Sequence, residues 1–130
     1  MNKRHIGVLL LLAICASAYT LAYIISLARR GEARQSVVVL ADCYRFVFAH
    51  EIDRPAPAEP FTIPKALSEM PGWTEHVENT VDPALRPLYH RIDWHPPEDL
   101  SEGKEIASIE LPRYRAVVLM GGAAYYIKKR

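Results

Sequence analysis

Cysteine is scarce in this sequence, with two residues in a chain of 130. Cys15 lies inside a long apolar run and Cys43 lies beyond it. A disulfide needs Cα atoms within about 7 Å of each other, so these positions argue against an internal bridge. The chain therefore has no disulfide framework. We interpret Cys43 as a buried thiol, with a bridge between two copies in an oxidising compartment as the alternative.

Familiar catalytic signatures are also missing. The sequence contains no HExxH, no paired CxxC and no G-x-S-x-G. Gly121-Gly122 is not followed by the helix or the Lys-Ser/Thr pair of a phosphate-binding loop. The remaining candidates are isolated serines and carboxylate pairs in a polar loop, namely Ser36, Ser68, Ser101, Ser108, Glu98/Asp99 and Glu102/Glu105. The sequence therefore predicts no enzyme, no catalytic residue and no cofactor.

The histidines are the residues closest to a metal-binding pattern. On a helix, His50 and Asp53 share a face at i, i+3, and His90 and His95 flank Asp93. This spacing matches no recognised ligand cluster, so ordinary surface histidines are the favoured interpretation and no metal-site residue is assigned. A small metal-binding or enzymatic domain using these side chains remains the less favoured alternative.

Charge of one sign is likewise lacking, since the net charge is +1. After Arg30, twelve Lys/Arg stand against fifteen Asp/Glu. No stripe of basic residues interleaved with aromatics is present, so we expect no nucleic-acid partner. The hundred residues that follow Arg30 suffice for one small domain.

The dominant feature is a charge-free run of twenty-three residues, Ile6 to Ala28, between Lys3-Arg4-His5 and Arg29-Arg30. As a helix it spans about 35 Å, enough for a hydrocarbon core of about 30 Å. The sequence therefore predicts a single-pass membrane anchor over residues 1–30, a signal-anchor with the lipid bilayer as its partner. We expect the N-terminus inside and the C-terminal domain outside the cytoplasm, although the basic residues on both flanks weaken the positive-inside argument.

Two alternatives concern processing of this segment. A secretory signal peptide would be cleaved after Ala18, but the apolar character continues beyond that residue, which favours an uncleaved anchor. A pilin-type leader would be cleaved after Gly7, because a short basic peptide there precedes the apolar run.

Residues 31–54 are predicted to form an amphipathic helical extension. Apolar residues recur at three- and four-residue spacing, namely Ala33, Val37, Leu40/Ala41, Tyr44 and Val47/Phe48. The β-branched run Val37–Val39 makes a strand the alternative. Residues 55–87 are predicted to be a Pro-rich irregular connection with short helices, one from Pro64 to Met70 and one from Trp73 to Asn79. His76 and Glu78 are interpreted as a solvated helix face.

Residues 88–130 are predicted to be an antiparallel β region. We expect strands at Leu88–Trp94 and at Glu105–Leu111, where polar and apolar residues alternate. Tyr114–Met120 and Ala123–Lys128 flank Gly121-Gly122, which predicts a hairpin with a two-residue primed turn. Core positions are favoured over interface positions for four aromatic residues, Trp73, Trp94, Tyr125 and Tyr126. The fold class is therefore α+β.

Two stretches carry a resemblance to a known family. Ser26–Gln35 is similar to the end of the first helix in type IV pilin-like proteins, in particular the pseudopilins of type II secretion, and Arg115–Ile127 resembles their terminal hairpin. The sequence departs from the family at Leu12, where a glutamate is expected, and at Val8, which replaces phenylalanine. The resemblance implies a structural subunit that associates with protein partners or with itself in a cell-envelope assembly. A tethered binding module whose sheet edge pairs with a partner strand is the alternative.

Overall fold

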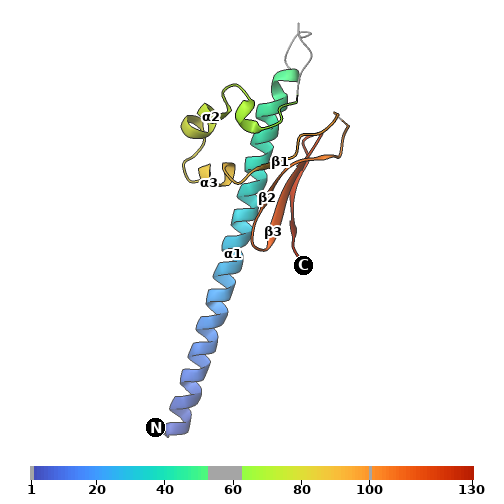
Figure 1. The fold of residues 1–130 in the computed structure, drawn as a ribbon. Coiled ribbons are helices and arrows are strands. Elements are labelled where there is room, and N and C mark those ends of the chain that lie inside the picture. The colour runs from blue at the N-terminus through green and yellow to red at the C-terminus, as the bar shows by residue number, and fades with distance from the viewer. Residues whose placement is uncertain (1, 53–62, 100) are drawn as a thin grey trace. The chain divides into compact units, whose positions relative to one another are not determined.

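The computed structural model describes residues 2–52, 63–99 and 101–130, with only the backbone for 49–52. The chain divides into two compact units, Met1–Glu32 and Ala33–Arg130. Helix α1 (Lys3–Ile52) contributes to both units (Figure 1). Residues 55–62, the first part of the predicted Pro-rich connection, lie outside the described residues.

The predicted helical extension is confirmed, because α1 continues without interruption to Ile52. The strand alternative for Val37–Val39 is wrong. No proline interrupts the helix between Lys3 and Ile52, so none of its backbone N–H donors is missing.

One face of α1 forms the spine of the second unit. Its fully buried positions include Ala33, Ser36, Leu40, Cys43 and Val47, which follow one another at alternating three- and four-residue steps. The predicted stripe included Val37 and Tyr44, which are only half-buried. The buried face is therefore turned slightly from the predicted one, toward Ser36 and Cys43.

Short helical turns follow the undescribed segment. They are a 3₁₀ turn η1 (Leu67–Glu69), the one-turn helix α2 (Trp73–Glu75), a π-helical turn η2 (His76–Thr80) and α3 (Arg86–Tyr89). The helix predicted from Pro64 begins later, at Leu67, whereas the helical turns predicted over Trp73–Asn79 are confirmed.

The strand predicted over Leu88–Trp94 is largely wrong. Helix α3 occupies the first part of that range, and only Asp93–Trp94 form a strand, β1. Pro87 lies in the first turn of α3, where its missing N–H is not needed, and Leu88 and Tyr89 are buried together from that turn.

The C-terminal region is a four-stranded antiparallel sheet with the order β1-β2-β3-β4, as the fold class predicted. β2 covers Glu105–Glu110, β3 covers Tyr114–Leu119 and β4 covers Ala124–Lys128. The hydrophobic core of the second unit joins the buried side chains of the sheet to those of α1 and the short helices.

The β3–β4 hairpin is confirmed. Its loop, closed by the pair Leu119 and Ala123, has three residues, Met120–Gly122, rather than two. Leu119 N donates to Ala123 O at 2.8 Å, and Gly122 N donates to Leu119 O at 3.0 Å. Gly121 and Gly122 have φ values of 106° and 97°, which only glycine adopts readily.

The polar–apolar alternation predicted for β2 does not produce one buried and one exposed face. Residues 106 to 109 are all buried. The register with β3 shifts between Glu105 and Ala107, which places one extra residue, Ile106, in β2. Ser108 and its partner Val117 are buried on the sheet face opposite to that of Ala107 and Val118.

Candidate functional site

A polar cluster joins α1 to the short helices of the second unit. The hydroxyl of Tyr89 donates to Asp42 Oδ2 at 2.6 Å. His76 Nε2 lies 2.8 Å from the same oxygen and must donate to it, since a carboxylate only accepts. One carboxylate on α1 therefore holds η2 and α3 at once.

Aromatic rings enclose this cluster. Phe46 stacks on the His76 ring with centroids 5.0 Å apart, and Trp73 meets Phe46 edge-on at 5.2 Å. Burial, followed by the hydrogen bond and charge of Asp42, raises the pKa of Tyr89 well above its usual range. Burial also raises the pKa of the neighbouring Cys43 thiol to about 12, with a smaller contribution from Asp42.

The cluster has a structural role: Asp42 holds His76 and Tyr89 against α1, and we call these three residues the clamp. Asp42 orients His76 as an acid orients the base of a nucleophilic enzyme. Cys43, however, is buried with a raised pKa and stays a neutral thiol at physiological pH, which makes it a poor nucleophile. The interpretation of His76 as a solvated side chain is wrong, whereas that of Glu78 as exposed is confirmed.

A small cavity of about 180 Å³ lies beside the clamp. Its lining residues are Ser68, Trp73, Thr74, Val77, Glu78, Tyr89 and His90. Small-molecule sites usually have volumes of about 300 Å³ or more. Trp73 and Tyr89 are also 7% and 8% exposed, so they offer a ligand little of their ring faces.

The candidate metal-ligating histidines lie in different surroundings. His90 caps α3 and has Nε2 3.8 Å from a Glu78 carboxylate oxygen, while His95 follows β1 and lies beside β2. Across the described residues, no three His, Cys, Asp or Glu side chains form a group suited to a metal ion. The side chain of His50 and all of Asp53 lie outside the described residues.

His95, Ser108 and Asp93 have the composition of a catalytic triad but not its geometry. His95 Nε2 lies 3.2 Å from Ser108 Oγ and 3.6 Å from Asp93 Oδ2. A triad uses opposite ring nitrogens for its serine and its acid, whereas here one nitrogen faces both. Ser108 is also buried, so a substrate has no access to its hydroxyl.

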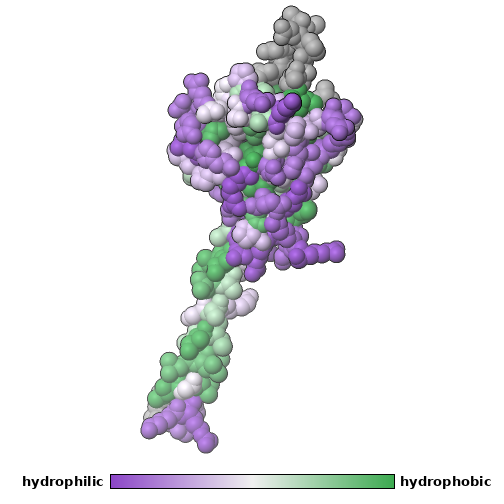
Figure 2. Space-filling model, in the orientation of Figure 1, coloured by the Kyte–Doolittle hydropathy of each residue, from purple (hydrophilic) through white to green (hydrophobic). Residues whose placement is uncertain are grey.

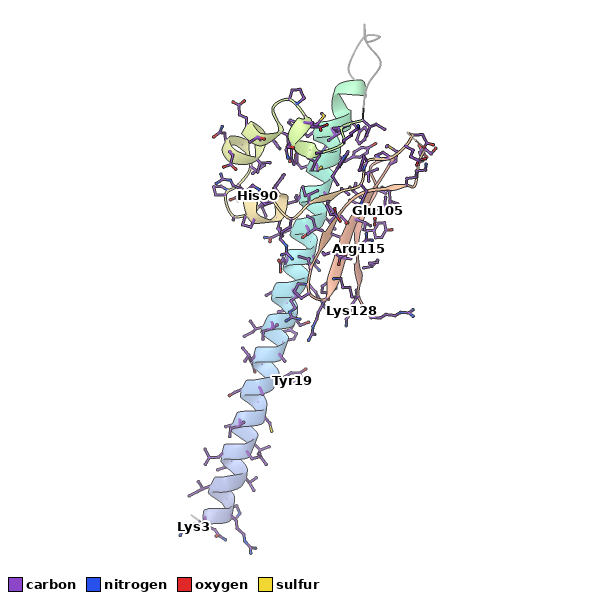
Figure 3. All side chains as sticks on the ribbon, viewed as in Figure 1. Lys3, Tyr19, His90, Glu105, Arg115 and Lys128 are labelled. Carbon is purple, nitrogen blue, oxygen red and sulfur yellow. The ribbon has the colours of Figure 1, made fainter. Side chains whose placement is uncertain are left out.

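An ion-pair network on the sheet includes Glu105 and Arg115, which are labelled in Figure 3. Arg115 donates to Glu105 and to Glu110, each at 2.7 Å, and Lys129 pairs with Glu110. A hydrogen bond from Lys129, with a smaller contribution from Arg115, lowers the pKa of Glu110. The hydrogen bond to Glu105 raises the pKa of Arg115. Glu105 was expected to be a solvated loop residue; it is half-buried at the start of β2.

A groove of about 330 Å³ lies between α1 and the edge strand β4. Its lining residues are Arg34, Val37, Ala124, Tyr125 and Tyr126. Tyr125 is 44% exposed, so the expected core position is wrong for this residue. Trp73 is buried as expected, and Tyr126 and Trp94 are half-buried.

The first unit presents a different kind of surface. Every large apolar side chain from Ile6 to Leu27 is between 41% and 76% exposed. This part of α1 is long and apolar enough to cross a membrane, a property shared by signal sequences. The core helix of a soluble protein would be mostly buried, whereas none of the most apolar window is buried. Figure 2 shows this continuous hydrophobic surface.

No known protein family, curated protein or solved structure matches this chain. Three side chains that sequence reasoning did not select, Asp42, His76 and Tyr89, form the polar cluster between α1 and the short helices. Two sequence features pointed toward this cluster: Asp42 directly precedes Cys43 on the packing stripe, and His76 lies one helical turn after Trp73. No sequence feature pointed to Tyr89.

Proposed function

We propose that this protein is a membrane-anchored assembly subunit of the cell envelope. In this account Ile6–Ala28 anchor the chain as a single span, and the unit that begins at Ala33 binds protein partners outside the cytoplasm. The observation that carries the proposal is the division of α1. Its first part exposes an unbroken apolar surface, and its continuation is the spine of a folded unit.

The same observation supports a pilin-like relationship. An apolar helix that continues into the core of a C-terminal antiparallel sheet is the plan of the family that the sequence resembles. Leu12 provides no carboxylate for contact between subunits in a fibre. We therefore assign the protein an anchoring or minor role in an assembly rather than that of the main fibre subunit.

Site-specific photocrosslinking in native membranes tests this role. Val38 is a suitable position for the crosslinker, because it is a 57% exposed apolar residue on α1 in the folded unit. Thr74, an exposed polar residue on α2, is the matched control. We expect adducts of higher mass from position 38 and few from position 74. A monomer at both positions would contradict the assembly role.

A second candidate is a binding module that uses strand addition. It is favoured by β4, which is an edge strand beside the 330 Å³ groove. A crosslinker at Tyr125 separates the two candidates. Adducts with a different protein at position 125, without adducts at position 38, favour strand addition; self-adducts at position 38 favour the assembly subunit.

A further inference from the structure

We propose that one end of the folded unit, its basic end, binds the headgroups of anionic phospholipids at a membrane surface. The basic end consists of Arg34, Arg113, Lys128, Lys129 and Arg130. The inference rests on the proposed membrane anchoring. It adds a specific lipid class and a second contact between protein and membrane.

The basic end is defined by contacts between β4 and the turn that joins β2 to β3. Lys128 is paired with Tyr114, and Lys129 N donates to Arg113 O at 2.8 Å. Among the described residues, Lys129 pairs with Glu110, while Arg113 and Lys128 have no carboxylate partner. Exposed cations without partners are free to bind an external anion.

This charge is locally concentrated rather than a general property of the unit. After Arg30 acidic residues outnumber basic ones, fifteen to twelve. Exposed acids away from the basic end include Glu69, Glu75, Glu78, Asp82, Glu98 and Asp99. A local group of cations on an otherwise acidic domain favours an anionic partner at that surface.

The course of β4 places the basic end beside the part of α1 that contains Arg34. A Cβ atom at Gly122, before β4, would lie 3.3 Å from Tyr44 Cε1. Further along the strand, Tyr125 and Tyr126 line the groove with Arg34. As β4 advances toward its basic end, its neighbours on α1 therefore move from residue 44 toward residue 34.

Sequence distance then connects this end to the apolar span. Arg34 follows Ala28, the last residue of the charge-free run, by six positions. Six helical residues rise by about 9 Å, which is within the reach of a long basic side chain near the headgroups. Arg34 is therefore close in sequence to the segment that we propose as the membrane span.

The side chains around the cations suit a lipid headgroup region. Tyr125 and Ile127 are 44% and 49% exposed on β4. Tyrosine together with lysine and arginine is typical of the membrane–water interface. The Arg34 groove combines one cation with apolar walls from Val37 and Ala124, which matches a phosphate group attached to acyl chains. Charge complementarity and the exposed apolar and aromatic side chains therefore favour an anionic bilayer.

Hydrogen exchange of the full-length protein in nanodiscs tests this contact. We compare discs of phosphatidylcholine alone with discs that also contain phosphatidylglycerol, and follow the amides of β4. We expect slower exchange in the anionic discs, because each basic side chain strengthens binding to the anionic surface by about fivefold. The K128Q/R130Q variant should lose most of the difference, and added salt should reduce it.

The K65Q/K104Q variant is the matched control, because both lysines are exposed and belong to other parts of the unit. It should retain the wild-type difference. Equal exchange in both lipids, or an equal loss in both variants, would overturn the lipid contact. Failure to incorporate into discs of either composition would instead overturn the membrane anchor, and the lipid contact with it.

Discussion

The Tyr89 hydroxyl donates a 2.6 Å hydrogen bond to Asp42 Oδ2, although the two residues are 47 positions apart. The same oxygen receives the bond from His76. Since the described part of the connection, residues 63–89, contains only short helical turns, side-chain contacts must hold it against α1. The Asp42 carboxylate is the polar part of that attachment.

Removal of the Tyr89 hydroxyl should therefore destabilise the folded unit. A hydrogen bond to a charged group contributes about 1.5–3 kcal/mol, so we expect Y89F to lower the free energy of unfolding by that order. Trp73 and Trp94 both belong to this unit, which makes tryptophan fluorescence during urea unfolding in detergent a specific measurement. Y125F, at an exposed ring, should leave the midpoint unchanged, and equal midpoints for Y89F and wild type would refute the clamp.

The folded unit should lose stability at alkaline pH. The folded-state pKa of Cys43 is raised to about 12, and that of Tyr89 is raised also, so the folded state keeps protons that the unfolded state releases. Their contribution is complete below the ordinary pKa values, about 8.5 for cysteine and 10 for tyrosine. It is lost as pH rises, by about 1.4 kcal/mol per pH unit for each group. Urea midpoints between pH 8 and 11 should fall less steeply in C43A and Y89F than in wild type; parallel slopes would contradict this assignment.

The hairpin loop requires glycine at residue 122. The φ of 97° is strained for other residues, and a Cβ atom would also press on Tyr44 at 3.3 Å. We expect G122A to destabilise the unit by about 1–3 kcal/mol in the same urea assay. G31A is the matched control, because α1 has open space there and a helical alanine stabilises by about 0.5–1 kcal/mol. A neutral G122A would show that the loop has another conformation.

Topology can be measured by thiol labelling. Ser101 is exposed on the loop before β2, whereas Cys43 is buried and its thiol neutral. We expect S101C to react with a membrane-impermeant maleimide in intact cells, while the parent protein with only Cys15 and Cys43 stays unlabelled. Labelling of S101C only after permeabilisation of the inner membrane would place the folded unit in the cytoplasm.

Local patterns were sufficient to predict the main elements. The three- and four-residue spacing from Ala33 to Phe48 predicted the continuation of α1, and Gly121-Gly122 predicted the hairpin. The signals were weaker where tertiary packing decided the structure. Leu88 and Tyr89 suit a strand by composition, yet their burial against the core selects a helix.

The polar clamp could not be predicted because its partners are distant in the sequence. His76 and Tyr89 lie 34 and 47 positions after Asp42, and no local pattern relates them. The same holds for β2, where alternation suggested an exposed face. A register shift and the neighbouring side chains instead bury both faces from Ile106 to Ile109.

The most direct test of the membrane-anchored account is the intact mass, with N-terminal sequence, of protein recovered from carbonate-washed membranes. A membrane-anchored protein stays in the membrane pellet and begins at Met1, or at Val8 if a pilin-type leader is removed. In both cases the apolar segment is retained. A soluble protein that begins at Tyr19 would contradict the account, because the segment would then be a cleaved export signal.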